Sequence, residues 1–353
     1  MENKINSINI DKIINELIKN YQLFTEEKKA IYYFVESLRE YLSFLQEFDK
    51  EIKNRNYTKL AQKKLDKAQN RIILATYLFE SKVVSIPVRE RIRKSFREFV
   101  GKYIYQSKII KHAYEKPRGY PGDYWLFERA YDNKPISKNI GYYFDIWILR
   151  HFLTVGIQYR KEKAKYFLRN FSKHRKGQLK ILNIGCGSCR EIRELLLEDI
   201  DLSKKLTFTC LDQDKRALEC AKKGIEDLNH NIDITFLTED ILPLIGLGGK
   251  HIRISPQDMI YSLGLADYFL KTTLENFIKF CYGNLSSGGK LIIAFCSSYN
   301  PKLYFHLRWF CEWNFYINDA YVIRDFIKNE LNIKNIRVIW DKPEPVFFII
   351  INK

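Results

Sequence analysis

The stretch that decides the fold is LKILNIGCGSCREIRELLLEDI, residues 179–200. An apolar run, Leu179 to Ile184, leads directly into a glycine turn and then into Ile and Leu at helical spacing. This order places the turn at the carboxyl end of the first strand of an open α/β sheet, where such sheets bind their ligands. Two glycines in the turn, Gly185 and Gly187, let the backbone approach a ligand closely.

Further apolar runs alternate with helical patterns down to residue 353, which predicts a sheet covered by helices. The runs are LTFTCLD (206–212), IDITFLT (232–238), DMIYSL (258–263), KLIIAFC (290–296), IRVIW (336–340) and VFFIIIN (346–352). Only DKPEP separates the last two runs. Because so short a connection cannot hold a crossover helix, we predict that this final pair is antiparallel.

The residues before this sheet are predicted to be helical, because apolar positions recur at helical spacing. The clearest segments are INIDKIINELIKNYQLF (8–24), AIYYFVESLREYLSFLQEF (30–48) and VRERIRKSFREFVGKYIYQSKII (88–110). Thr25, followed by Glu26 and Glu27, is a predicted helix start, since acidic residues favour the amino end of a helix.

Two breaks divide the chain. The segment KPRGYPGD (116–123) holds two prolines and two glycines, which stops any helix, and the basic stretch SKHRKGQLK (172–180) is the predicted domain junction. We therefore predict three parts: a helical N-terminal domain at 1–115, a motif-bearing cap with linker helices at 116–178, and a ligand-binding domain at 179–353.

The composition excludes several classes of protein. With 46% hydrophobic and 29% charged residues, 16 Gly and 9 Pro, the chain is neither collagen-like nor disordered. No apolar stretch approaches the ~20 residues of a membrane helix, and the first 20 residues do not form a signal-peptide core, so we expect a cytoplasmic protein. Cys186 and Cys189 form one CxxC, but no second ligand pair follows at a suitable spacing, so no metal site is predicted.

Charge is divided unevenly along the chain, whose formal net charge is +17. Residues 1–178 hold 37 Lys and Arg against 20 Asp and Glu, whereas residues 179–353 hold 22 of each kind. This asymmetry suggests an acidic partner or substrate, such as nucleic acid, an acyl carrier protein or a phosphate-bearing thioester. Solvated lysine-rich helix faces explain it equally well.

Acidic residues follow the second and third predicted strands. Asp212 ends the second strand, 25 residues beyond Gly187, where a carboxylate accepts hydrogen bonds from both hydroxyls of an unphosphorylated ribose. After the third strand, Asp240 is placed to accept from the exocyclic amine of adenine, while Ile241 is placed to pack on the ring. These residues predict a site for an adenosine.

The same region disfavours a dinucleotide. A dinucleotide fingerprint would need glycine at position 190, where this chain has Arg190. A glycine turn, a ribose acid and an adenine acid without a pyrophosphate site favour S-adenosyl-L-methionine as the cofactor. The predicted cofactor contacts are Gly185, Gly187, Asp212, Asp240, Ile241, Tyr120 and, at the end of the fourth strand, Ser262.

With these residues in place, residues 179–353 resemble the class I S-adenosylmethionine-dependent methyltransferases. The resemblance implies an α/β fold, a Rossmann-like seven-stranded class I methyltransferase sheet, here joined to a helical N-terminal domain. The chain departs from the family pattern at Asn183, where an acid is usual, and at Cys189, where a third glycine is common. Both departures concern how the methionine amino group is held.

Three segments carry a narrower resemblance: KPRGYPGDY (116–124), IYSLGLADYF (260–269) and RWFCEWNFY (308–316). They look like the methyltransferases of 3-hydroxypalmitic acid methyl ester biosynthesis, which make the extracellular-factor signal of quorum sensing. The resemblance covers roughly residues 90–353. It implies transfer of a methyl group to the carboxyl group of a fatty or hydroxy-fatty acid, giving a fatty acid methyl ester.

The first of these segments also supplies groups suited to an acid acceptor. A carboxylate with an ordinary pKa near ~4 is ionised at neutral pH, so it needs a clamp and no general base. Arg118 offers a bidentate clamp, and Tyr120 and Tyr124 are placed to contact cofactor or acceptor. His306, after the fifth strand, is the candidate base. A rigid interdomain turn and a packing histidine are the structural alternatives.

Other functions are compatible with the sequence. A nucleic-acid or protein methyltransferase would use the basic half, but enzymes that methylate base or glutamine amines commonly carry D/N-P-P-Y/F where this chain has SLGL (262–265). A non-catalytic cofactor-binding module whose helical half recruits a partner is a further alternative. The favoured acceptor is a small molecule, free or as a carrier-bound acyl group, and the sequence does not predict an oligomeric state.

Overall fold

The chain divides into two compact units, each described here by itself. The helical unit comprises Met1–Pro121, Asn133–His151 and Pro301–Asn314, and the sheet unit comprises Gly122–Asp132, Phe152–Asn300 and Phe315–Lys353. The structure is a computed structural model that describes residues 10–13, 15–17, 19–53, 55–199, 201–202, 205–226, 228, 233–247, 254–300, 304–341 and 345–353.

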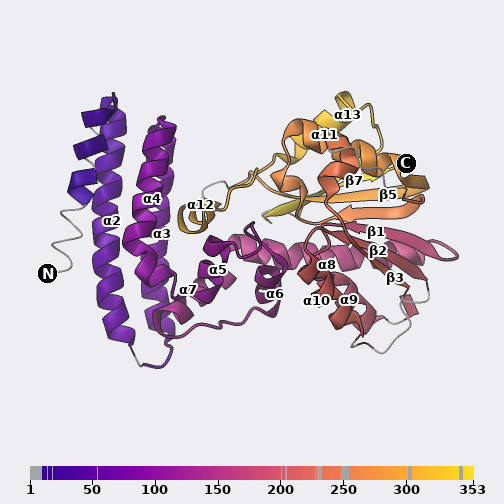
Figure 1. Ribbon diagram of the computed structural model, residues 1–353, viewed down its shortest axis with the longest axis horizontal. Coiled ribbons are helices and arrows are strands. Elements are labelled where there is room, and N and C mark those ends of the chain that lie inside the picture. Colours follow the sequence, from indigo (N-terminus) through magenta and orange to yellow (C-terminus); the bar gives the residue numbers. More distant parts are fainter. Residues whose placement is uncertain are drawn as a thin grey trace. The chain divides into compact units, whose positions relative to one another are not determined.

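The helical unit combines long helices with short ones (Figure 1), and each of the long helices buries an apolar stripe. Its helices are α2 (Thr25–Ile52), α3 (Lys59–Lys82), α4 (Ile86–Ile104), α5 (Lys108–Glu115), α7 (Asn139–Leu149) and α12 (Phe305–Cys311). Helix α2 begins at the predicted Thr25, where the Glu27 carboxylate accepts a hydrogen bond of 2.9 Å from the backbone N–H of Phe24. Trp309 is fully buried in the core of this unit, with its ring centroid 5.0 to 5.7 Å from three phenylalanine rings.

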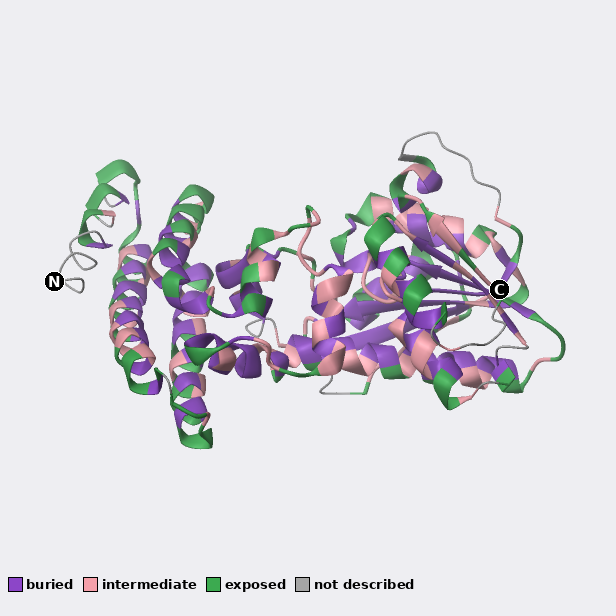
Figure 2. Ribbon diagram, turned by 60° about the horizontal axis from the view of Figure 1, so that its bottom comes forward, coloured by how far each residue is buried: buried purple, intermediate pink, exposed green. Residues whose placement is uncertain are grey.

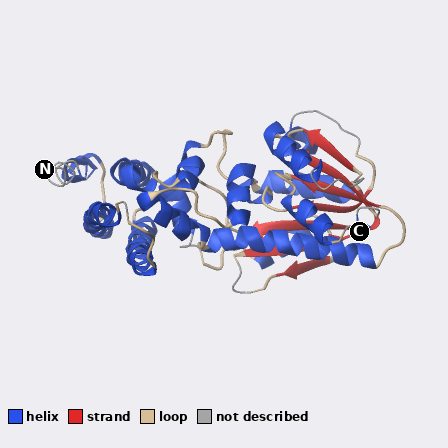
Figure 3. Cartoon of the chain, turned by 90° about the horizontal axis from the view of Figure 1, so that it is seen from below, coloured by secondary structure: helices blue, strands red, loops and turns tan. Residues whose placement is uncertain are grey.

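The sheet unit contains one seven-stranded sheet of order β3-β2-β1-β4-β5-β7-β6. Figure 3 shows its strands in red, with helices beside them. The strands are β1 (Leu179–Ile184), β2 (Leu206–Asp212), β3 (Ile234–Thr238), β4 (Gln257–Ser262), β5 (Leu285–Cys296), β6 (Ile336–Ile339) and β7 (Val346–Asn352). The first five strands pair in parallel, and β7 pairs antiparallel with both β5 and β6. The predicted antiparallel final pair is confirmed, and the order is that of class I methyltransferases.

Helices cover both faces of this sheet, which explains why its strands read as continuous apolar runs. Helices α8 (Phe152–Lys173), α9 (Arg190–Glu198) and α10 (Lys215–Glu226) lie on one face, and α11 (Lys271–Gly283) and α13 (Ala320–Asn329) lie on the other. Successive residues of β1 alternate between the two cores: Ile181 packs under α8 and α9, and Leu182 packs under α11. Figure 2 shows the strands buried and the outer helix faces exposed.

Shorter elements complete the sheet unit near the ends of the strands. They are α6 (Tyr124–Asp132), η2 (Pro243–Leu247) after β3, and η3 (Ala266–Tyr268) after β4. The predicted break is confirmed, because α5 ends at Glu115 and α6 begins at Tyr124. Within the described part of the chain, no helix has the length and apolarity needed to cross a bilayer.

Candidate functional site

The glycine turn after β1 leaves room for a ligand beside its backbone. Gly185 and Gly187 have φ values of 67° and 55°, a region that favours glycine. A Cβ placed on Gly187 would meet no described atom within 4 Å, whereas one on Gly185 would lie 3.4 Å from the Cβ of Leu265. Cys189 also adopts a left-handed φ of 51°, which explains why a glycine suits this position. The turn is therefore closed on the Gly185 side and accessible at Gly187.

Asp212, the predicted ribose acid, binds this turn directly. Its Oδ2 accepts a hydrogen bond of 2.8 Å from the backbone N–H of Gly187, and its Oδ1 accepts one of 2.9 Å from the backbone N–H of Asp214. Burial raises the pKa of Asp212, although both backbone donors oppose the shift. Since each carboxylate oxygen has two lone pairs, Asp212 keeps acceptor capacity for two ligand hydroxyls.

The remaining predicted cofactor residues of the sheet unit lie at the same edge. Because β3, β2, β1 and β4 are neighbours and parallel, their carboxyl ends meet there. Asp240, after β3, is exposed, and its Oδ1 accepts a hydrogen bond of 2.9 Å from the backbone N–H of Leu242. Ile241 is buried in the apolar core. Among the described residues, no partner binds the buried Oγ of Ser262, which ends β4.

A tether between α6 and the glycine turn was not predicted from the sequence. The Glu128 carboxylate accepts a hydrogen bond of 2.6 Å from Ser188 Oγ and one of 2.7 Å from Arg190 Nη1. Arg190 also pairs with Asp132 at 3.2 Å, and all these groups are partly buried. Arg190 thus holds α6 against the glycine turn. Only the tertiary packing brings these residues together.

Asn183, the position of the missing family acid, faces the core and not the ligand edge. Its Nδ2 donates a hydrogen bond of 2.8 Å to Glu191 Oε1, which also accepts one of 2.8 Å from the Tyr261 hydroxyl. Burial raises the pKa of Glu191 to about 8, and the neighbouring Cys189 charge adds to the shift. The Asn183 side chain is therefore committed to a buried network beneath the turn.

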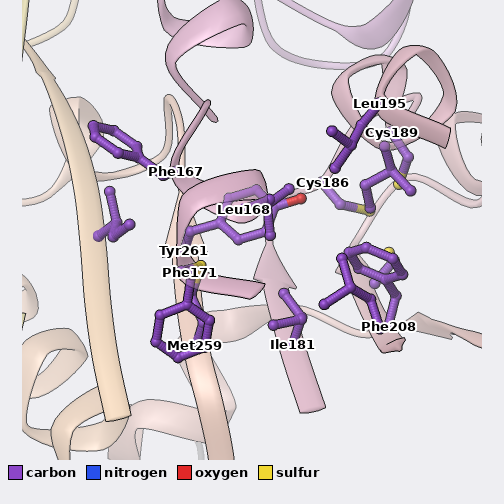
Figure 4. Close-up of a cluster of buried hydrophobic side chains, with 14 of the residues drawn as sticks. Phe167, Leu168, Phe171, Ile181, Cys186, Cys189, Leu195, Phe208, Met259 and Tyr261 are labelled. Atoms are coloured by element: carbon purple, nitrogen blue, oxygen red, sulfur yellow. The ribbon is translucent and has the colours of Figure 1, made fainter. Parts of the chain in front are cut away.

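Three thiols also meet beneath the turn. Cys186 and Cys189 are joined by Cys210 of β2, which sequence spacing did not connect with them, and their Sγ atoms lie within 4.8 Å of one another. Figure 4 shows Cys186 and Cys189 among apolar core side chains that include Leu195 and Phe208. Contacts from the other two thiols lower the pKa of Cys189 to about 5, whereas burial raises those of Cys186 and Cys210. In the described chain, no fourth metal-ligating side chain joins this group.

The predicted catalytic residues fall in both units. Arg118 and Tyr120 belong to the helical unit, whereas Tyr124 is the first residue of α6 in the sheet unit. Asp123, just before it, is buried, and its Oδ1 accepts a hydrogen bond of 3.0 Å from the backbone N–H of Leu126, as expected of a helix cap. The catalytic roles of Arg118, Tyr120 and Tyr124 stay predictions.

His306 lies in the aromatic core of the helical unit. Its side chain is buried, with ring centroids 3.7 Å from His151 and 5.4 Å from Trp147. Burial lowers the pKa of His151 to about 4. The surroundings of His306 are those of a packing histidine, the structural alternative considered from the sequence, and its role as a base stays a prediction.

Comparisons with known proteins find similar solved structures but no matching family. No family model and no curated protein matches the sequence. The chain is similar to a possible exported protein from Bordetella parapertussis, at 15% identity and a TM-score of 0.53, over 91% of this chain and 96% of that one. It is also similar to magnesium protoporphyrin IX methyltransferase from Synechocystis with bound S-adenosylhomocysteine, at 13% identity and a TM-score of 0.48, over 70% of this chain and 99% of that one.

A third similar structure is the N-methyltransferase NodS from Bradyrhizobium japonicum in complex with S-adenosyl-L-homocysteine. Its identity is 15% and its TM-score 0.38, over 55% of this chain and 87% of that one. At such identities, these likenesses concern the fold alone.

Proposed function

We propose that this protein is an S-adenosyl-L-methionine-dependent methyltransferase whose favoured acceptor is the carboxyl group of a fatty or hydroxy-fatty acid. One observation carries the first part of the proposal. The carboxylate that ends β2 binds the backbone of the glycine turn after β1, at the carboxyl edge of a sheet with the class I methyltransferase order. Open α/β sheets bind ligands at this edge.

The residues at this edge suit the cofactor. Space beside Gly187 admits a ligand, Asp212 retains lone pairs for the ribose hydroxyls, and the unpartnered Oγ of Ser262 offers a hydrogen bond near the methionine end. Asp240 and Ile241 would hold the adenine. The departure at Asn183 means that another group must hold the amino acid end of the cofactor, because the Asn183 amide is bound to Glu191.

The cofactor supplies an electrophilic methyl group on a sulfonium, so the protein's task is to align the acceptor and exclude water. An acid acceptor is already ionised at neutral pH and needs no general base. Arg118 would bind its carboxylate, while Tyr120 and Tyr124 would orient acceptor or cofactor. The choice of a fatty acid is supported by the resemblance of the segments 116–124, 260–269 and 308–316 to the fatty acid methyl ester family.

Mass spectrometry of a reaction with methyl-labelled cofactor tests this proposal. The panel contains fatty acids, 3-hydroxy fatty acids, an acyl carrier-bound fatty acid, peptides and RNA. We expect label in a base-labile methyl ester. Label in RNA or peptide alone would refute the acid acceptor while keeping the methyltransferase, and cofactor binding without any labelled product would favour the non-catalytic module.

A further inference from the structure

Arg160, in the middle of α8, is a buried arginine with an unusual environment. Its side chain is 6% exposed. Within the described residues, its Nε is buried and donates no hydrogen bond, and the guanidinium forms no ion pair. Buried arginines are almost always paired, because removing a cation from water without a counter-charge is costly.

The guanidinium lies against the loop that follows β4. A Cβ placed on Gly264 would stand 2.7 Å from Nη1 and 2.9 Å from Nη2 of Arg160, so only glycine leaves this space. The guanidinium carbon also lies 5.0 Å from the centroid of the Phe127 ring on α6. The Phe127 ring contacts the cation, and the absence of a side chain at Gly264 leaves room for it, but neither residue neutralises its charge.

This position adjoins the predicted cofactor turn. Leu265 follows Gly264, and its Cβ approaches Gly185. Ser262 lies two residues before Gly264, and its buried Oγ has no partner among the described residues. An unpaired guanidinium and an unpaired hydroxyl therefore flank the same short loop at the carboxyl edge of the sheet. Both are donors, and together they suit an anionic acceptor group.

The nearby acid does not neutralise Arg160. Asp267, in η3, accepts hydrogen bonds from the backbone N–H of Cys296 at 2.9 Å and from Asn318 Nδ2 at 3.3 Å. It feels the charge of Arg160 but makes no ion pair with it in the described structure, and burial raises its pKa to about 6. The half-buried Tyr131 and the buried Cys296 also feel this charge, and both are neutral at pH 7 because burial raises their pKa values.

We propose that the Arg160 guanidinium binds a ligand carboxylate at the loop after β4, either the amino acid carboxylate of the cofactor or the carboxylate of an acid acceptor. This proposal rests on the proposed function and deepens it, because it identifies the group that recognises the anionic end of a ligand. The planar fork of arginine matches a carboxylate with two parallel hydrogen bonds, which a lysine cannot reproduce.

Four variants separate binding from packing. Arg160→Met removes the charge with little loss of volume, Arg160→Lys keeps the charge without the fork, and Gly264→Ala displaces the guanidinium without changing any charge. Arg169→Met is the matched control, because Arg169 lies on the same helix and pairs with Glu198 at 2.9 Å. The probes are S-adenosylhomocysteine, 5′-methylthioadenosine, which lacks the amino acid group, and palmitate beside its uncharged amide.

Calorimetry with these probes distinguishes the two sources of the carboxylate. If Arg160 binds the cofactor, Arg160→Met lowers the affinity for S-adenosylhomocysteine by about 10- to 150-fold and leaves the affinity for 5′-methylthioadenosine unchanged. If Arg160 binds the acceptor, Arg160→Met binds both nucleosides as wild type does. Its affinity for palmitate falls by a similar factor, while its affinity for the amide is unchanged. In either case Gly264→Ala follows Arg160→Met, Arg160→Lys is intermediate, and Arg169→Met behaves as wild type.

Two further outcomes would overturn the proposal. In the first, Arg160→Met binds every probe like wild type. In the second, its affinity for both nucleosides falls by the same factor and its melting temperature without ligand also falls, which is the result expected if Arg160 only packs the core. If wild-type protein binds neither nucleoside, the proposed cofactor fails separately. The carboxylate site is then tested by palmitate alone. Weaker palmitate binding in Arg160→Met would support the site, and unchanged palmitate binding would overturn it.

Discussion

Two buried glutamates, one in each unit, have opposite surroundings. Glu80 of the helical unit accepts hydrogen bonds from Arg93 Nε at 2.7 Å, from Arg308 Nη1 at 3.2 Å and from Trp309 Nε1 at 2.7 Å. Glu191 of the sheet unit accepts only from neutral donors, and burial raises its pKa to about 8. Glu80 is therefore neutralised by two arginines, whereas Glu191 has no cationic partner and the buried Arg160 of the same unit makes no ion pair in the described structure.

This difference separates structural from functional polar groups. Removing one partner of a buried ion pair is costly, because it leaves the other charge uncompensated. A buried charge without a partner lowers stability unless a ligand completes it. In the sheet unit, the Arg160 guanidinium of α8 lies against Gly264 in the loop after β4, and Ser262 ends that strand, at the edge where open α/β sheets bind ligands. The comparison therefore predicts that removing Glu80 lowers stability, whereas removing Arg160 weakens ligand binding.

The largest expected effect is in the helical unit. Glu80→Ala should lower its free energy of unfolding by about 3–5 kcal/mol, because two guanidinium groups and an indole N–H lose their acceptor. Hydrogen exchange measured on peptides of α3 and α4 reports this unit separately from the strands. Glu51→Ala, which breaks the exposed pair with Lys64, is the control and should exchange like wild type. Unchanged protection in Glu80→Ala would contradict the comparison.

The second effect is a pH dependence confined to the sheet unit. The pKa of Glu191 is raised from 4.5 to about 8, so the folded state binds an extra proton between these values and stability falls as the pH rises through them. Glu191→Gln keeps an acceptor for Asn183 and Tyr261 but cannot ionise. It should therefore gain stability over wild type on going from pH 5 to pH 9, by at most a few kcal/mol.

Thermal unfolding at several pH values measures this gain. Because the neighbouring Cys189 also titrates in this pH range, only the difference between variant and wild type is informative. A difference that does not change with pH would show that Glu191 has an ordinary pKa.

Third, Asp212→Ala should weaken the binding of S-adenosylhomocysteine by about 1.5–3 kcal/mol, or roughly 10- to 150-fold in affinity. The ribose loses a charged acceptor, and the backbone N–H of Gly187 loses its hydrogen bond. Calorimetry of a variant with wild-type circular dichroism is the measurement. The affinity of Asp212→Asn should lie between those of wild type and Asp212→Ala, since asparagine retains one acceptor oxygen. Unchanged affinity in Asp212→Ala would remove Asp212 from the site.

Fourth, Arg118→Ala and Tyr120→Phe should lower methyl transfer by about tenfold or more, equivalent to about 1.4 kcal/mol, with a much smaller change in stability. Initial rates and melting temperatures are compared for each variant. Lys111→Ala, at an exposed position within α5, is the control. Equal losses of rate and stability would identify the 116–124 segment as a rigid turn, the structural alternative.

The smallest effect concerns the positive charge of residues 1–178. If this charge steers an acidic carrier, the apparent Michaelis constant for a carrier-bound acceptor should rise with salt while turnover stays nearly constant, since the Debye length falls from ~10 Å at 0.1 M to ~3 Å at 1 M. A free fatty acid should respond much less. An equal response from both acceptors would assign the charge to solvated helix faces.

The fold was predictable because parallel strands buried on both faces are continuous apolar runs. The predicted ranges of β1 and β2 equal the observed ones. The start of β5 was predicted five residues late, because Ser286 to Gly289 carry no apolar signal and are held by backbone pairing that begins at Leu285. Residues at strand ends, such as Asp212, were predictable because topology alone brings them to one edge.

Side chains that converge through tertiary packing were not predictable. Glu128 reaches Arg190 from α6, Cys210 joins the CxxC from a neighbouring strand, and Arg160 reaches Gly264 from α8. None of these pairs has a characteristic spacing along the chain. Burial without a partner, which distinguishes Arg160 from Arg169 of the same helix, is a property of the folded structure alone.

The central claim is that the carboxyl edge of this sheet binds S-adenosylmethionine and not a dinucleotide. Side-by-side calorimetric titrations of wild-type protein with S-adenosylhomocysteine and with NAD test it most directly. The account predicts saturable 1:1 binding of S-adenosylhomocysteine that Asp212→Ala weakens, and no binding of NAD. Binding of NAD together with no binding of S-adenosylhomocysteine would contradict it.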